Sequence, residues 1–188
     1  MTKHNGFTLV DLVATVSVLG ILVTIAIPGF SKWLPDQRLK SAARDLYTNM
    51  QLSKIGAIKS NAPWAIVFDN SANPGRYYIC SDDGANDAWD GPAAMGGDDV
   101  AERTIEFAIY KSGITYGCGN ATDDIPGSGS PPADTITYGS DVAVFNPKGT
   151  SNGGYVYLHN KENITSYGVS TLTTGVIRIF KWTGNGWE

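Results

Sequence analysis

The sequence has 188 residues, enough for one compact domain plus an appendage. Charged residues make up 17%, and 22 glycines with 9 prolines indicate a loop-rich body. The formal net charge of −4 argues against attraction of the whole chain to nucleic acid or anionic lipid. Two cysteines are too few for a metal cluster or a dense disulfide framework.

Residues 7–30 form a largely apolar run whose single formal charge is Asp11. A helix of this length spans about 36 Å, enough for a bilayer core of about 30 Å. The short segment before the run is basic at Lys3, which predicts a cytoplasmic N-terminus with the rest of the chain beyond the membrane. We therefore expect a transmembrane helix over residues 7–30.

Three interpretations of this run compete. A secretory signal would need a small-x-small cleavage site after the run, and residues 26–33 offer none. A plain membrane anchor explains the hydrophobicity but not Asp11, because an unpaired charge in hydrocarbon costs about 2.5 kcal/mol or more. The third interpretation is a processing site at the start of the run.

The stretch GFTLVD at residues 6–11 resembles the processing site of type IV pilins and pseudopilins. The resemblance implies that a prepilin peptidase cuts between Gly6 and Phe7 and methylates the new amine of Phe7. Asp11 lies one helical turn from that amine, so the acid can pair with the amine of the same or a neighbouring subunit. Pilins usually carry Glu where this chain has Asp11, so the acid here is shorter by one methylene.

The helix is expected to continue to Ser60. Pro28 should kink or loosen it, as the proline that pilins often carry at this place does, and Pro35 is a second expected breaker. Asn61 and Pro63 should end the helix. An apolar stripe with helical spacing is predicted to pack on the chain's own globular domain, and it consists of Leu39, Ala42, Ala43, Leu46, Met50 and Ala57.

Two further stretches, RLKSAARDL at residues 38–46 and QLSKIGAIKSN at residues 51–61, resemble the GspH/FimT branch of pilin-like proteins. The resemblance implies a minor pseudopilin of type II secretion or a minor type IV pilin. Its implied partners are other pilin or pseudopilin subunits, the prepilin peptidase, an inner-membrane assembly platform and membrane lipid. Its implied location is the inner membrane with a periplasmic head, followed by a pseudopilus or pilus filament.

Beyond Trp64 the pattern changes to short runs rich in aromatic and β-branched residues, separated by turn signals. Strands are expected over residues 64–68, 76–80, 104–110, 135–138, 142–145, 154–158, 167–170 and 175–182. The predicted fold is α+β: a long N-terminal helix packed on an antiparallel, β-sandwich-like head, as in pilins. The chain would comprise a cleaved leader (1–6), a transmembrane and filament-packing helix (7–30), an amphipathic helical half (31–61) and a periplasmic head (62–188).

Two loops and the cysteines need separate interpretations. Six aspartates lie in residues 82–99, and carboxylates suit calcium, but EF-hand spacing fails at Ala85. A solvated loop is therefore preferred and no metal site is predicted, while residues 122–132 read as a surface loop. Cys80 and Cys118 are expected to form a disulfide that stabilises the chain by roughly 4 kcal/mol. Two free, buried thiols are the alternative.

The sequence does not predict an enzyme or a cofactor. It lacks the phosphate-binding Gly-x-x-x-x-Gly-Lys and the zinc-binding His-Glu-x-x-His patterns. After cleavage between Gly6 and Phe7, His159 would be the single histidine, and a lone histidine is more often structural or exposed than catalytic.

Two alternatives to a secretion or pilus subunit stay open. FimT-like minor pilins for DNA uptake carry a Gly-Arg-x-Arg element near the C-terminus, and the stretch GVIR at residues 175–178 keeps its second arginine, Arg178. With Lys181 and Trp182 it would form a weak basic and aromatic patch, although a strand edge that ends in Arg178 is the plainer interpretation. The other alternative is a major pilin of a long filament, against which the branch resemblance argues.

Overall fold

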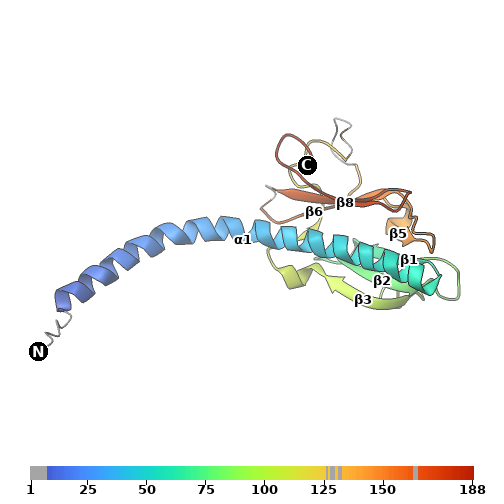
Figure 1. Ribbon diagram of the computed structural model, residues 1–188, viewed down its shortest axis with the longest axis horizontal. Coiled ribbons are helices and arrows are strands. Elements are labelled where there is room, and N and C mark those ends of the chain that lie inside the picture. The colour runs from blue at the N-terminus through green and yellow to red at the C-terminus, as the bar shows by residue number, and fades with distance from the viewer. Residues whose placement is uncertain (1–7, 126, 128–129, 131–132, 163–164) are drawn as a thin grey trace, which may run out of the picture. The chain divides into compact units, whose positions relative to one another are not determined.

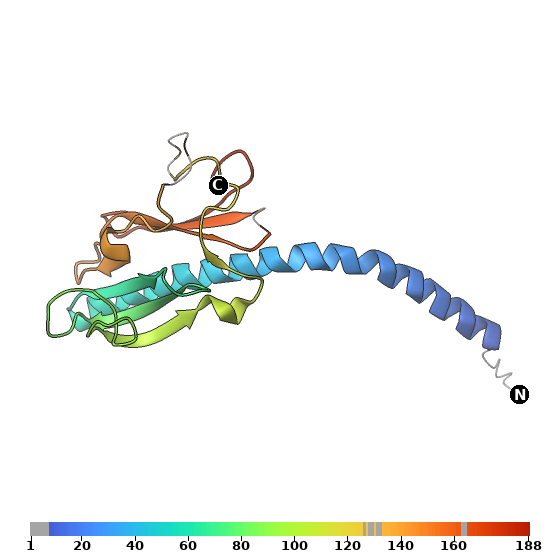
Figure 2. The same ribbon diagram turned by 180° about the vertical axis from the view of Figure 1, so that it is seen from behind.

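The computed structural model describes residues 8–125, 127, 130, 133–162 and 165–188, and only the backbone of residues 25–32 (Figures 1 and 2). It divides into two compact units, Met1–Pro35 and Asp36–Glu188. One long helix, α1 (Leu9–Ser60), contributes to both units. The remaining elements are β1 (Trp64–Asp69), β2 (Arg76–Asp82), β3 (Val100–Glu106), the 3-10 turn η1 (Phe107–Tyr110), β4 (Thr115–Tyr116), the 3-10 turn η2 (Gly139–Asp141), β5 (Val142–Phe145), β6 (Gly154–His159), β7 (Ser166–Thr171) and β8 (Ile177–Lys181).

The first unit consists of the N-terminal part of α1, whose large apolar side chains are exposed. Between Leu9 and Val23 their exposed fractions run from 54% at Val23 to 78% at Leu9, and Leu34 is 39% exposed. The hydroxyls of Thr15, Ser17 and Thr24 donate hydrogen bonds of 2.7–2.9 Å to carbonyls of their own helix. Because these polar groups are satisfied within the helix, its outer surface is left to apolar side chains.

No helix found among the described residues is long and apolar enough to cross a membrane. The transmembrane helix expected over residues 7–30 therefore stays a prediction.

The two prolines of α1 do not end the helix, which runs unbroken from Leu9 to Ser60. The expectation that Pro35 would act as a breaker is therefore wrong. A proline removes one backbone donor, and a long helix keeps the bonds of the flanking turns. Pro28 is one of the residues whose side chains are not described, so the kink expected there stays a prediction.

In the second unit, α1 packs on the head through the predicted stripe. All six stripe residues are at most 1% exposed, which confirms that prediction. Two polar residues, Asn49 and Ser53, lie on the same buried face, and the Asn49 amide donates to the Tyr77 hydroxyl at 2.8 Å. The helix ends at Ser60 as expected, and Asn61 follows it at φ 52°, a left-handed conformation that asparagine tolerates.

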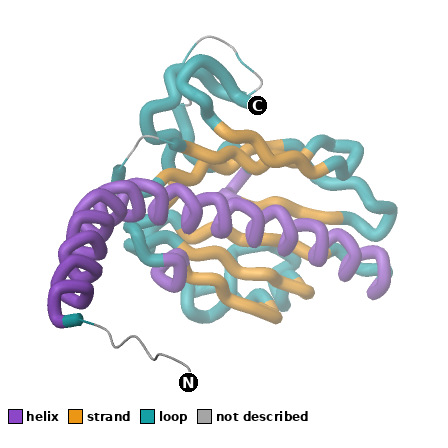
Figure 3. Tube along the Cα trace, turned by 60° about the vertical axis from the view of Figure 1, so that its left-hand side comes forward, coloured by secondary structure: helices purple, strands orange, loops and turns teal. Residues whose placement is uncertain are grey.

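Two antiparallel four-stranded sheets form the head. Sheet 1 has the order β3-β2-β1-β5, and sheet 2 has the order β4-β6-β7-β8. In sheet 1, Ile66 of β1 lies opposite Ile79 of β2 and Ala143 of β5. In the second unit, the two sheets lie on either side of the C-terminal part of α1 (Figures 1 and 3). The predicted α+β class, with a helix packed on antiparallel sheets, is confirmed.

One core joins α1 to both sheets. Apolar side chains of the helix, β1, β2, β6 and β7 form a single buried cluster. Phe68 of β1 meets Tyr116 of β4 edge to face, with ring centroids 6.1 Å apart, and Phe68 also stacks on Tyr138 at 5.6 Å. These aromatic contacts link the two sheets across the core.

Three strand predictions need correction. Strand β3 begins at Val100, four residues earlier than expected, and residues 107–110 form η1 instead of continuing the strand. Residues 135–138 make one isolated bridge, between Ile136 and Val156, and the two-residue β4 was not predicted. In each case, whether the segment forms a strand depends on whether another strand lies beside it. The local sequence does not specify that pairing.

The outer face of sheet 1, away from α1, is covered by the segment between β2 and β3. A second apolar cluster forms there from Ala65, Val67, Tyr78, Cys80 and Val142. Trp89, from the aspartate-rich segment at residues 83–99, packs against this cluster. Trp89 thus fastens the segment to the sheet, while most of its other residues, Asp87, Asp90 and Asp98 among them, are exposed as a solvated loop would be.

Candidate assembly site and acidic loop

Asp11 closes the first turn of α1. The Thr8 backbone N–H and hydroxyl both donate to Asp11 Oδ2, at 3.1 and 2.6 Å, and the Asp11 N–H donates to Thr8 Oγ1 at 3.2 Å. This reciprocal arrangement is a capping box, which satisfies backbone donors that a helix N-terminus leaves unpaired. The acid that was predicted as an assembly residue therefore also has a local role.

The processing prediction falls on residues at the very start of the chain. Gly6 and Phe7 lie outside the described residues, so cleavage between them, methylation of Phe7 and pairing of its amine with Asp11 stay predictions. The structure shows that Asp11 stands among exposed apolar neighbours, Val10 and Leu12, at the beginning of the helix. If these apolar neighbours were covered by other apolar groups, burying the Asp11 carboxylate with them would cost free energy unless a cation paired with it.

A second exposed apolar surface lies on the head, between α1 and β3. Two adjacent hollows of about 620 and 650 Å³ share Leu52 and Arg103 in their walls. Leu52 and Ile55 of the helix are about half exposed there. The hollows follow the direction of α1 and have polar walls as well, with Asp45 in one and Lys59 in the other.

The predicted disulfide between Cys80 and Cys118 is absent, and both cysteines are free. Cys80 is buried in β2 on the outer face of sheet 1. Cys118 follows β4 of sheet 2, where its carbonyl accepts a hydrogen bond from the Ser166 hydroxyl at 2.6 Å. Burial, with the neighbouring Asp99 charge, raises the pKa of the Cys80 thiol to about 12, so the thiol stays protonated.

The residues predicted for nucleic-acid contact are not brought together. Arg178 and Lys181 are both exposed on β8, but three positions apart on a strand they point to opposite faces. Trp182 is buried and packs on Trp187, with ring centroids 5.4 Å apart. It is therefore not available as a stacking platform for bases.

One sequence pattern that the prediction overlooked is GTSNG at residues 149–153, which has the Gly-x-Ser-x-Gly spacing of a hydrolase nucleophile elbow. That elbow needs a strand-to-helix turn with an exposed serine. Here the pattern lies between β5 and β6, and the buried Ser151 hydroxyl donates to the Leu172 carbonyl at 2.8 Å. Ser151 is a structural residue of this turn.

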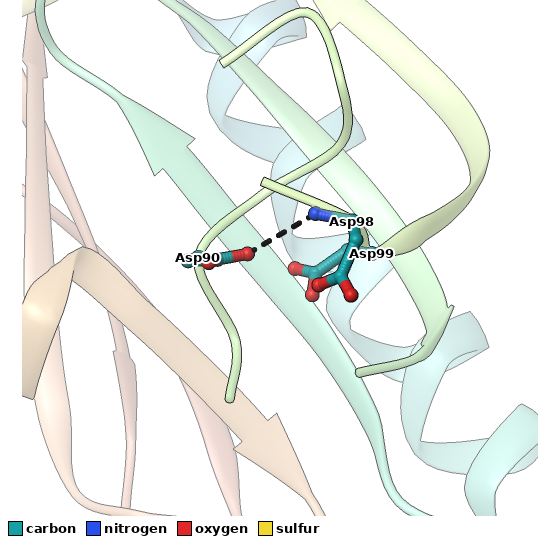
Figure 4. A group of neighbouring side chains, drawn as sticks. All are labelled: Asp90, Asp98 and Asp99. Atoms are coloured by element: carbon teal, nitrogen blue, oxygen red, sulfur yellow. Dashed lines mark hydrogen bonds between the residues drawn. The ribbon is translucent and has the colours of Figure 1, made fainter. Parts of the chain in front are cut away.

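Three of the six aspartates of residues 82–99 converge, as Figure 4 shows. One carboxylate oxygen from each of Asp90, Asp98 and Asp99 lies within 4.8 Å of the other two. Asp90 and Asp98 are exposed, whereas Asp99 is 5% exposed. The sequence prediction counted these residues but could not group them, because positions 90, 98 and 99 follow no known ligand spacing.

Backbone donors hold this cluster in place. The Gly91 N–H donates to Asp99 Oδ2 at 2.8 Å, and the Asp98 N–H donates to Asp90 Oδ1 at 3.3 Å. The Ala85 N–H donates to Asp98 Oδ2 at 2.8 Å. Burial and the charges of Asp90 and Asp98 raise the pKa of Asp99 above its ordinary value.

The head, its helical core and the exposed N-terminal part of α1 define a pilin-like α+β subunit. The sequence comparison agrees, because residues 42–175 match the family described as type II transport protein GspH. The chain therefore belongs to the GspH family, a family of structural pilin-like proteins. No match was found among curated proteins or among solved structures. The family match includes every residue of the buried stripe except Leu39, together with β1–β7, but neither the processing segment nor β8.

Proposed function

We propose that this chain is a pseudopilin subunit of a type II secretion system, which assembles with other subunits through the N-terminal part of α1. Membership of the GspH family supports the class of protein. The observation that carries the assembly role is the first unit itself: its large apolar side chains are exposed and its hydroxyls are bonded to their own helix. Such a surface is unfavourable in water and suits lipid or the helices of neighbouring subunits.

In this proposal the subunit is first held at the inner membrane, with its N-terminus in the cytoplasm and its head in the periplasm. A prepilin peptidase then cleaves between Gly6 and Phe7, and an inner-membrane assembly platform adds the subunit to the pseudopilus. The basic Lys3 before the apolar run supports the orientation. The resemblance of residues 6–11 to pilin processing sites supports the cleavage.

Asp11 would have two successive roles. In the single chain its carboxylate accepts two hydrogen bonds from Thr8. Cleavage before Phe7 would create a positive amine, and the carboxylate of a neighbouring subunit would neutralise it within the apolar packing of the filament. Without a cationic partner, a carboxylate buried among apolar helices would cost about 2.5 kcal/mol or more.

The test uses three variants of the full chain, expressed with the other subunits, the peptidase and the assembly platform. Asp11→Asn keeps an acceptor for Thr8 but removes the charge, Asp11→Glu keeps the charge, and Asp11→Ala removes both. We expect Asp11→Asn and Asp11→Ala to lower incorporation into sheared filaments at least about tenfold, since 1.4 kcal/mol corresponds to a factor of ten. Asp11→Glu should assemble normally.

Membrane-fraction levels and the mass of the mature N-terminus are the controls, and neither should change among the variants. If Asp11→Asn assembled as well as the wild type, the amine-pairing role would be refuted and the capping box would account for Asp11. If the wild-type chain did not co-purify with any other filament subunit, the proposed function itself would be wrong.

A further inference from the structure

The starting observation is an unpaired oxygen in the acidic cluster. Asp99 is 5% exposed, and its Oδ2 accepts the Gly91 N–H. Its other oxygen, Oδ1, is buried and has no hydrogen-bond partner in the part of the chain that the structure describes. A buried carboxylate oxygen needs a donor or a cation, because it has been removed from water without compensation.

The surrounding side chains do not supply the missing positive charge. Residues 82–99 contain no lysine or arginine. The salt bridge found among the described residues, Arg76–Asp69, lies elsewhere. The Cys80 thiol hydrogen-bonds to the Asp99 side chain, but a thiol is a weak donor and brings no positive charge.

The carboxylates of Asp90 and Asp98 lie close to Asp99 and add negative charge that a cation would neutralise. Figure 4 shows the carboxylates of Asp98 and Asp99 next to each other, with Asp90 facing them from the other side of the loop. Three acidic side chains within 4.8 Å repel one another unless a cation or a proton joins them. We propose that Asp90, Asp98 and Asp99 bind a divalent cation, and that Ca²⁺ is the cation that fits best.

Ligand chemistry and spacing favour Ca²⁺. All three side chains offer hard oxygen ligands. Ca²⁺ binds oxygens at about 2.3–2.6 Å, so two ligands on opposite sides of the ion are up to about 5 Å apart. A spread of up to 4.8 Å is compatible with that limit. Mg²⁺ demands near-ideal octahedral geometry and usually keeps several of its waters, so it suits a site of three protein carboxylates less well. The exposed sides of Asp90 and Asp98 leave room for water to complete the coordination.

A bound cation would fasten the segment that covers sheet 1. Asp98 and Asp99 directly precede β3, whereas Asp90 follows Trp89, which packs on the outer face of the sheet. One ion would connect these two points of the segment. The inference does not depend on filament assembly, because all three ligands come from the head of a single chain.

The test measures Ca²⁺ binding by the full chain in detergent after chelator treatment. Calorimetric titration with CaCl₂ should show one saturable site, with a dissociation constant of about 10⁻⁴–10⁻³ M as in extracellular calcium modules. The melting temperature should be higher in CaCl₂ than in EDTA. MgCl₂ at the same concentration should raise it less.

Matched variants assign the site. Asp98→Asn removes one charged ligand at an exposed position and should weaken Ca²⁺ binding by roughly tenfold or more. Asp87→Asn removes the same charge from the same segment outside the cluster, at a φ of 55° that asparagine tolerates. That control should bind Ca²⁺ within about twofold of the wild type.

Three results would overturn the proposal. The first is the absence of both binding heat and a melting shift at millimolar CaCl₂. The second is an equal loss in Asp87→Asn and Asp98→Asn, which would show diffuse attraction to an acidic segment. The third is an Asp99→Asn chain that melts higher than the wild type without any response to Ca²⁺ in either, which would show that a proton neutralises Asp99.

Discussion

The two regions of α1 differ in how their apolar side chains are covered. Leu12 and Leu19, in the first unit, are 60% and 58% exposed, whereas Leu39 and Leu46, in the second, are fully buried. In the first region the large apolar side chains between Leu9 and Val23 are all exposed. In the second, six apolar residues form one stripe that the chain's own sheets cover, while Leu52 and Ile55 stay about half exposed. A single apolar stripe is the pattern of a helix that packs on its own domain, and the first region lacks this one-sided pattern.

Polar residues sharpen the same contrast. In the first region Thr15 and Ser17 bond to their own helix. In the second, Asn49 bonds to Tyr77 of β2, and the Lys54 ammonium donates to the Gly175 carbonyl at 2.8 Å. Polar groups of the core region thus fix the helix to its head, whereas the Thr15 and Ser17 hydroxyls bond only within their own helix.

The largest expected effect comes from cutting the same side chain in each region. Leu46→Ala should lower the free energy of unfolding of the head by about 2–5 kcal/mol, because it leaves a cavity in a fully buried position. Leu19→Ala, the matched control on the same helix, should change it by less than about 0.5 kcal/mol. Denaturant unfolding of the full chains in detergent, followed by tryptophan fluorescence, measures both. If both variants lost the same free energy of unfolding, the distinction between a buried and an exposed region of α1 would be wrong.

A smaller effect should come from the buried charge of the head. Asp69 is buried and pairs with Arg76 Nε at 2.8 Å. Burial alone would raise the pKa of Asp69, but hydrogen bonds from Ser71, Arg76 and Ala72 outweigh it and hold that pKa below its ordinary value. Since the unfolded pKa is about 3.9, the contribution to stability is complete above about pH 4 and is lost as the pH falls through the lower folded pKa.

Asp69→Asn should therefore lower the free energy of unfolding by about 1–3 kcal/mol at pH 7 and reduce its fall below pH 4. Melting curves over a pH series would check this. Asp11→Asn, which changes the exposed acid of the first unit, should leave the unfolding of the head unchanged. An Asp69→Asn chain with the wild-type acid dependence would show that another carboxyl governs acid unfolding.

The smallest expected effect concerns DNA. Because Arg178 and Lys181 face opposite sides of β8 and Trp182 is buried, Arg178→Ala should change DNA retention by less than about twofold across a salt series. Gel-shift titration of the full chain and the variant would measure it. Binding that weakens steeply with salt and with Arg178→Ala would instead support the DNA-uptake alternative.

Much of the architecture could be predicted from the sequence because its signals are local. The stripe from Leu39 to Ala57 has a helical period, and the Asn61-to-Pro63 turn marks the end of α1. The runs at residues 64–68, 142–145 and 154–158 are β-branched and aromatic, and all three form strands. These features are specified by neighbours in the chain.

The failed predictions depended on long-range register. Cys80 lies opposite Ala65 and shares the outer face of sheet 1 with Tyr78, which separates it from Cys118 in sheet 2. The presence of two cysteines in the sequence suggests a disulfide, but the sequence does not reveal which face of a sheet each cysteine lies on. The convergence of Asp90 with Asp98 likewise results from how the segment folds back on itself.

The edge of sheet 1 has a consequence for how such subunits can join. Strand β3 is an outer strand, its exposed positions include Glu102, Arg103 and Glu106, and its pairing with β2 is interrupted by bulges beside Cys80. Charges and bulges on an edge strand prevent another chain from adding to the sheet. In the proposed filament, subunits could therefore lie side by side without pairing sheet 1 to sheet 1 along β3.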